Sequence, residues 1–139
     1  MREIERFLLE LGTDFTFVAR QKRMTIGSAD YHLDLLFYHR RLRCLVAFEL
    51  KIGKFQPADT GQIELYLRWL DKHERRDGEN PPIGVILCSG KESEEVALLR
   101  LDEKGIRVAE YLTNMPSRQV LTKKLRQAIH LARERLARS

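Results

Sequence analysis

The chain has 139 residues, which is enough for one ordinary domain and too few for two. Hydrophobic residues make up 43% of the sequence and charged residues 32%, a composition that argues against a disordered chain and against a membrane protein. There is no run of about 18 apolar residues and no signal-peptide pattern, so we expect a soluble, cytoplasmic protein with no membrane partner. The two cysteines lie outside any CxxC motif and the four histidines lack zinc-ligand spacing, which argues against a zinc site.

The charge is distributed unevenly along the chain. There are 25 basic and 20 acidic residues, a formal net charge of +5. From Ser117 to Ser139 there are seven basic residues and one acid, so this short segment is strongly basic. Such a segment fits a nucleic-acid partner, although many basic helix faces are simply solvated.

Hydrophobic periodicity and the positions of Gly and Pro predict a series of helices and strands. In chain order they are a helix over 2–11, two extended pieces within 14–27, strands over 31–39 and 42–51, a long helix opened by Pro57, a strand over 83–88, a helix over 92–101, a strand over 106–112 and a last helix from 117. This order predicts an α/β fold. Its mixed central sheet has an antiparallel meander followed by a strand–helix–strand crossover, with helices on both faces.

Charged side chains lie on the two richest strands, 31–39 and 42–51. Because side chains alternate between the faces of a strand, Glu49 and Lys51 share one face. If residues 40–41 form a two-residue connection, although they lack the Asn-Gly signature, Asp34 pairs with Ala47. Asp34 then lies diagonally from Glu49, with the two Cβ atoms about 7–8 Å apart. The spacing therefore predicts two carboxylates and a lysine on one patch of sheet.

This combination of groups suits two interpretations. Two close carboxylates with open positions suit Mg²⁺, and a hydrated Mg²⁺ beside a lysine suits phosphodiester hydrolysis. The alternative is an Asp–Lys–Glu salt-bridge network on a partly solvated sheet. The tripeptide itself is common, since Asp102-Glu103-Lys104 also fits acid-x-Lys in this chain. Only Glu49-Leu50-Lys51 closes an apolar strand that follows another strand bearing an acid.

Five sequence blocks, in order along nearly the whole chain, resemble the nuclease domain of the YhcG-type bacterial proteins, a branch of the PD-(D/E)xK (restriction endonuclease-like) nuclease superfamily. The blocks are Phe7-Leu-Leu-Glu-Leu-Gly12, Asp34-Leu-Leu-Phe-Tyr-His39, Glu49-Leu-Lys-Ile-Gly-Lys-Phe55, Gly84-Val-Ile-Leu-Cys88 and Val108-Ala-Glu-Tyr111. The proline of the superfamily's Pro-Asp pair is absent, because a leucine precedes Asp34.

The resemblance implies a role for five residues of this chain. By position, Asp34 and Glu49 correspond to metal ligands and Lys51 to the catalytic lysine. Glu10 corresponds to the acid of the first helix and Gln62 to an auxiliary residue of the helix that follows the strands. The implied activity is that of a metal-dependent DNA endonuclease that uses Mg²⁺, with Mn²⁺ as a possible substitute. A catalytically inactive copy of the fold, serving DNA binding or assembly, is the alternative.

The resemblance also bears on partners and on domain organisation. Basic residues near the expected site are candidates for contacts with DNA phosphates; they are Arg20, Lys22, Arg23 and Lys54. A homodimer would provide two sites for cutting two strands. Proteins of this type usually carry a separate domain ahead of the nuclease domain. We therefore expect residues 1–139 to form a single nuclease domain, either the C-terminal part of a longer protein that has an N-terminal domain or a stand-alone member.

Overall fold

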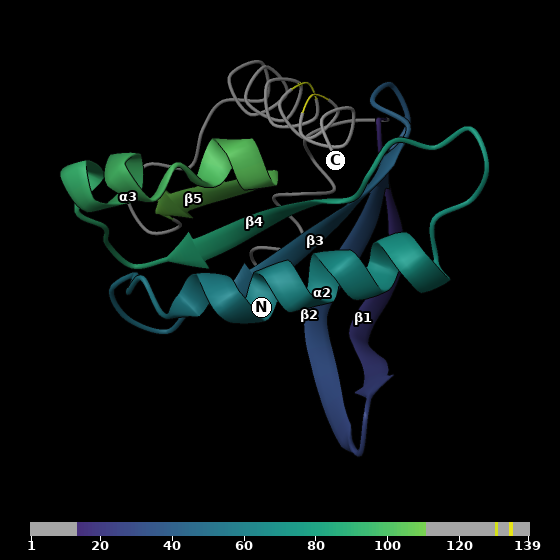
Figure 1. The fold of residues 1–139 in the computed structure, drawn as a ribbon, viewed down its shortest axis with the longest axis horizontal. Coiled ribbons are helices and arrows are strands. Elements are labelled where there is room, and N and C mark those ends of the chain that lie inside the picture. Colours follow the sequence, from purple (N-terminus) through teal and green to yellow (C-terminus); the bar gives the residue numbers. More distant parts are fainter. Residues whose placement is uncertain (1–13, 111–129, 131–133, 135–139) are drawn as a thin grey trace.

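The computed structural model describes residues 14–110 together with His130 and Glu134. In this part of the chain, five strands form one sheet in the order β1-β2-β3-β4-β5 (Figure 1). The elements are β1 (Phe15–Ile26), β2 (Ala29–His39), β3 (Cys44–Leu50), α2 (Asp59–His73), β4 (Ile83–Cys88), α3 (Ser93–Leu99), a 3₁₀ turn (Leu101–Lys104) and β5 (Ile106–Glu110). The expected helices over 2–11 and from 117 lie outside the described residues.

The strand pairing confirms the predicted mixed sheet. β1 pairs with β2 and β2 with β3 in antiparallel fashion, which is the expected meander. β3, β4 and β5 are parallel neighbours, and α2 and α3 form the crossovers between them. None of the described helices is long and apolar enough to cross a membrane.

The centre of the sheet is buried on both faces. All six residues of β4 and the first five of β3 are buried, which explains their continuous apolar sequences. One face packs against α2 through Ile63, Tyr66, Leu67 and Leu70. Gly84 allows this close approach, because a Cβ atom there would lie 2.9 Å from Cγ1 of Ile63. The helix and the sheet therefore share one apolar core.

Within 14–27, residues 15–26 form the single strand β1, so the prediction of two extended pieces is wrong. The basic cluster 20–23 lies in the middle of β1, where β1 pairs continuously with β2. The chain turns later, at Gly27, whose φ of 62° suits a tight hairpin turn. The resulting hairpin extends past α2 and away from β4 and β5 (Figure 1).

The connection between β2 and β3 is longer than expected. His39 pairs with Cys44, so residues 40–43 form a four-residue loop in place of a two-residue turn. An Arg-Arg turn would require positive φ at residues that disfavour it, whereas here only Arg43 adopts such a value, at 50°. The loop is tied back through the ring of His39, whose Nδ1 accepts a hydrogen bond from the backbone N–H of Leu42. The longer loop shifts the predicted strand register by two residues.

Candidate active site

Asp34 and Glu49 lie where β2 and β3 separate. The ladder between these strands ends at the pair Leu35–Phe48, and the two acids are the next residues of each strand. The backbone N–H of Asp34 donates to Oε1 of Glu49 at 3.1 Å, and the N–H of Leu50 donates to Oδ2 of Asp34 at 2.7 Å. We call this point the fork. The acids are directly opposite each other, and the predicted diagonal arrangement is wrong because the loop 40–43 is longer than assumed.

The carboxyl group of Glu49 is electrostatically strained at the fork. Burial and, second, the negative charge of Asp34 together raise the pKa of Glu49 to about 7, against the lowering effect of the hydrogen bond from the Asp34 N–H. Near neutral pH, the fork therefore favours taking up a positive charge, which either a proton or a cation can supply.

Lys51 follows the fork at the end of β3. Its backbone N–H donates to the carbonyl of Leu87, which continues the pairing of β3 with β4. Its Nζ lies 3.2 Å from Oδ1 of Asp59, the first residue of α2. The other oxygen of Asp59 accepts a hydrogen bond from the N–H of Gln56 at 2.8 Å. Sequence reasoning missed Asp59, although an acid in the first turn of the helix after the lysine is a visible signal.

Gln62 contacts Tyr66, whose phenol is influenced by the charges of the fork. The amide Nε2 of Gln62 donates to the hydroxyl of Tyr66 at 2.7 Å. Tyr66 is buried in the core. Burial and, second, the negative charge of Glu49 together raise its pKa to about 12. The phenol of Tyr66 thus stays protonated beside the carboxylates, and Gln62 holds its oxygen.

The remaining predicted site residues have separate positions. Glu10 lies outside the described residues. Arg20 and Arg23 are exposed on β1. Nζ of Lys22 is 2.7 Å from Glu74 at the end of α2, and Nζ of Lys54 is 2.8 Å from Glu92. These two lysines therefore have acidic partners within the chain.

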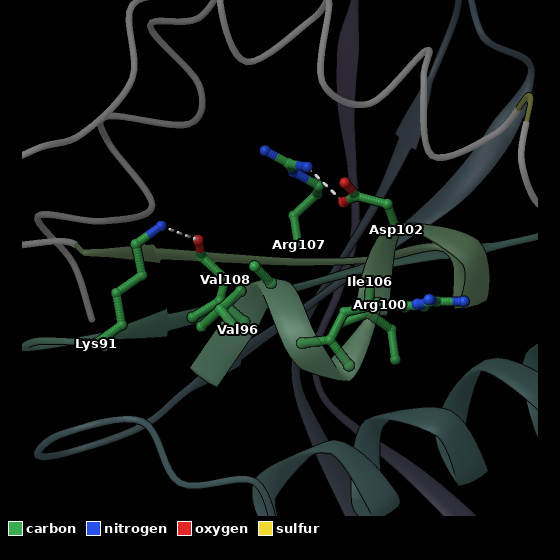
Figure 2. Close-up of a pocket in the computed structure, with 9 residues that line it drawn as sticks. Lys91, Val96, Arg100, Asp102, Ile106, Arg107 and Val108 are labelled. Carbon is green, nitrogen blue, oxygen red and sulfur yellow. Dashed lines mark hydrogen bonds and ion pairs between the residues drawn. The ribbon is translucent and has the colours of Figure 1, made fainter. Parts of the chain in front are cut away.

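A cavity of about 110 Å³ lies against β5, apart from the fork. Lys91 donates to the carbonyl of Val108 at 3.1 Å, and Arg107 is bonded to Asp102 (Figure 2). Arg100 points away from Lys91 in the same view. The cationic groups of this cavity diverge, and two of them are already bonded, so it is a poorer site for an anionic substrate than the fork.

The second acid-x-Lys tripeptide has a structural setting. Residues 101–104 form a 3₁₀ turn, in which Asp102 pairs with Arg107 and Nζ of Lys104 lies 2.8 Å from Glu64. Each charge therefore faces an opposite charge on another part of the chain. Sequence context separated this copy from the one at Glu49.

The donor set of the fork fits a hard divalent cation. Among the described residues, no group of three or more His, Cys, Asp or Glu side chains could hold a metal. Asp34 and Glu49 offer two carboxylates, and Mg²⁺ is commonly bound by one or two carboxylates while it keeps several waters. Burial and the charge of Asp34 raise the pKa of Glu49, so a cation bound there would offset an unfavourable negative charge. The oxygen ligands also exclude a preference for soft metals.

The arrangement of the strands is that of restriction endonuclease-like nucleases. A repair endonuclease from Pyrococcus abyssi superposes with a TM-score of 0.57 at 17% identity, covering 79% of this chain and 46% of that one. The structure of EndoMS in complex with double-stranded DNA gives a TM-score of 0.57 at 17% identity, covering 83% of this chain and 45% of that one. These similarities define the fold class.

The sequence comparisons define the family within that class. Residues 1–129 match the family model of the YhcG PDDEXK nuclease domain. The protein YhcG of Escherichia coli (strain K12) is 44% identical over 121 residues, which cover 86% of this chain and 32% of that protein. The chain belongs to the YhcG PDDEXK nuclease domain family. It spans about a third of the length of this relative.

Proposed function

We propose that this chain is a metal-dependent endonuclease domain that hydrolyses phosphodiester bonds of DNA at the fork. The observation that carries the proposal is the pair Asp34 and Glu49, which lie opposite each other, with Lys51 directly after β3. The N–H of Asp34 donates to Glu49, and the N–H of Leu50 donates to Asp34. Membership of a nuclease-domain family supports hydrolysis of a nucleic acid. The DNA in the EndoMS complex favours DNA as the substrate class.

Asp34 and Glu49 would hold the divalent cation, Mg²⁺ or in its place Mn²⁺. When bound, such an ion polarises a phosphoryl oxygen and lowers the pKa of a coordinated water. Fixed hydrogen bonds to both carboxylates keep them in place without a metal, so little reorganisation accompanies binding. Gln62 would act through the phenol of Tyr66, to which it donates and whose pKa the charge of Glu49 raises. Glu10 is proposed as a further acid of the site.

Lys51 would orient the attacking water and offset the negative charge that develops on the phosphate. Its side chain is about one-third exposed, so it is open to substrate. Asp59 limits the positions that the side chain can adopt, because its carboxylate contacts Nζ at 3.2 Å. Lysine suits this role as a compact cation with three donors.

Substrate DNA would run along the projecting hairpin. Arg20 and Arg23 are exposed there, and Lys22 and Lys54 would exchange their acidic partners for phosphates. We further propose that residues 1–139 act as one nuclease domain of a longer cytoplasmic protein, whose N-terminal domain directs it to its target. A homodimer would bring two forks to the two strands of a duplex.

The test is cleavage of supercoiled plasmid and of a branched DNA with Mg²⁺, with Mn²⁺ and with EDTA. We expect metal-dependent cleavage that falls by at least about 100-fold in Lys51→Ala. Lys72→Ala, which removes an exposed lysine from the last turn of α2, is the matched control and retains full activity. Absence of cleavage, with equal salt-sensitive DNA binding by all three proteins, would favour a catalytically inactive module for DNA binding or assembly.

A further inference from the structure

Gln21 has an unusual backbone conformation for the interior of a strand. Its φ is 51°, a left-handed value that glycine adopts freely and that residues with a Cβ atom disfavour. The pairing of β1 with β2 nevertheless continues on both sides of it, through Arg20–Leu35 and Lys22–Leu33. This register sets Gln21 opposite Asp34. Strained backbone of this kind often occurs at functional sites.

The hairpin changes faces at this position. In a regular strand, residues three apart lie on opposite faces. Here Leu33 and Leu36 of β2 both pack in the core that contains α2. On β1, Ala19 packs against the same core and Lys22 contacts Glu74 at the end of α2. Gln21 therefore lies where both strands depart from the regular alternation of side chains between the two faces.

The side chain of Gln21 contacts the proposed metal ligand. Its amide Nε2 donates a hydrogen bond to Oδ1 of Asp34 at 3.1 Å. The other oxygen, Oδ2, accepts the hydrogen bond from the N–H of Leu50. Each oxygen of Asp34 thus has one fixed donor. Because a carboxylate oxygen can accept two bonds, each still has capacity for a ligand.

We propose that Gln21 is a positioning residue that fixes the carboxylate of Asp34 for metal binding. The inference rests on the function proposed above. The positioning role belongs to the side-chain amide of residue 21 and not to its backbone. A second hydrogen bond removes the freedom of Asp34 to rotate about the bond from Leu50. Partners of this kind commonly alter metal affinity by about 10–100-fold when they are removed.

Two substitutions separate the amide from the backbone. Gln21→Gly accepts positive φ without strain and has no amide. Gln21→Asn tolerates the same backbone, but its amide is one methylene too short to reach Asp34. Arg43→Gly is the matched control, since Arg43 has φ of 50° in the loop 40–43 and does not belong to the fork.

Mn²⁺ binding to the whole chain is measured from the electron paramagnetic resonance signal of the free Mn²⁺. Thermal unfolding and plasmid cleavage are measured on the same proteins. We expect both Gln21 variants to bind Mn²⁺ at least about 10-fold more weakly, with an unchanged or raised Tm. Cleavage by these variants should recover at high Mn²⁺ concentration. Arg43→Gly should bind Mn²⁺ as the unsubstituted protein does.

The outcomes distinguish this inference from the proposed function. If the unsubstituted protein binds Mn²⁺ and cleaves DNA, and both Gln21 variants match it in Mn²⁺ affinity, the positioning role is wrong and the proposed function stands. If affinity falls only in step with Tm, residue 21 serves the hairpin alone and the inference is again overturned. If the unsubstituted protein neither binds Mn²⁺ nor cleaves DNA, the proposed function fails and takes the inference with it.

Discussion

Phe48 and Glu49 are neighbours in β3, yet they contribute to the protein in opposite ways. Phe48 is 1% exposed and makes tilted or edge-on ring contacts with Phe15 and Phe37. Glu49, one residue later, is half-buried beside another acid, and its pKa is raised to about 7. The apolar residue stabilises the fold, whereas the acid is held in an unfavourable environment. The candidate site thus begins where the strand ladder and the apolar core end.

Replacing the apolar residue tests the stabilising side of this comparison and should give the largest effect. Phe48→Ala would remove buried aromatic surface and leave a cavity, so we expect the free energy of unfolding to fall by about 3–5 kcal/mol. Urea unfolding followed by circular dichroism measures it. Phe17→Ala is the control, because Phe17 also contacts Phe37 but is 43% exposed. Equal losses for the two variants would contradict the account.

Replacing Glu49 should raise the free energy of unfolding, whereas replacing Phe48 lowers it. A carboxyl group whose pKa is higher in the folded than in the unfolded state loses its contribution to stability as pH rises from about 4.5 through 7. Glu49→Gln removes this loss and keeps an oxygen that can accept from the Asp34 N–H. We therefore expect the metal-free variant to gain about 1–3 kcal/mol at pH 8 and almost nothing at pH 4.

Urea unfolding of Glu49→Gln at several pH values, in EDTA, measures this difference. The same variant should lose metal-dependent cleavage, so stability and activity would change in opposite directions. A variant that is less stable than the unsubstituted protein at pH 8 would show that Glu49 is not strained at the fork.

The smallest expected effect concerns the exposed pair beside the site. Glu92 holds Lys54 and raises its pKa, so this lysine is partly withdrawn from phosphates. We expect Glu92→Gln to strengthen DNA binding a few-fold. Lys54→Ala should weaken DNA binding and reduce the slope of log K for DNA binding against log[salt] by about one. Fluorescence anisotropy in EDTA measures both. Glu94→Gln controls for the general change of charge. If it strengthens DNA binding as much as Glu92→Gln does, Lys54 does not contact DNA.

Much of the fold could be predicted because it follows from local apolar patterns. The patterns over 42–51 and 83–88 predicted strands, and the structure has β3 and β4 there, next to each other in the sheet. The loop 40–43 and the unbroken β1 were missed. Their geometry depends on long-range contacts, such as the hydrogen bond from Nδ2 of Asn80 to the carbonyl of Leu42, which no local pattern contains.

The candidate site was predictable in its charged residues but not in their supports. Asp34, Glu49 and Lys51 could be selected because Glu49-Leu50-Lys51 closes an apolar strand and the preceding strand carries Asp34. The sequence did not predict that Gln21 contacts Asp34, because glutamine inside a strand is not expected to adopt a left-handed backbone conformation. Asp59 and its contact with Lys51 depend on where α2 begins, two residues after the expected start at Pro57.

The most direct test of the central claim is anomalous diffraction from crystals of the whole chain grown with Mn²⁺. The account predicts one anomalous peak between the carboxylates of Asp34 and Glu49, and its loss in Glu49→Gln crystals grown under the same conditions. The account would be contradicted if the protein cleaves DNA with Mn²⁺ but its crystals show the ion elsewhere and no anomalous peak at these two carboxylates.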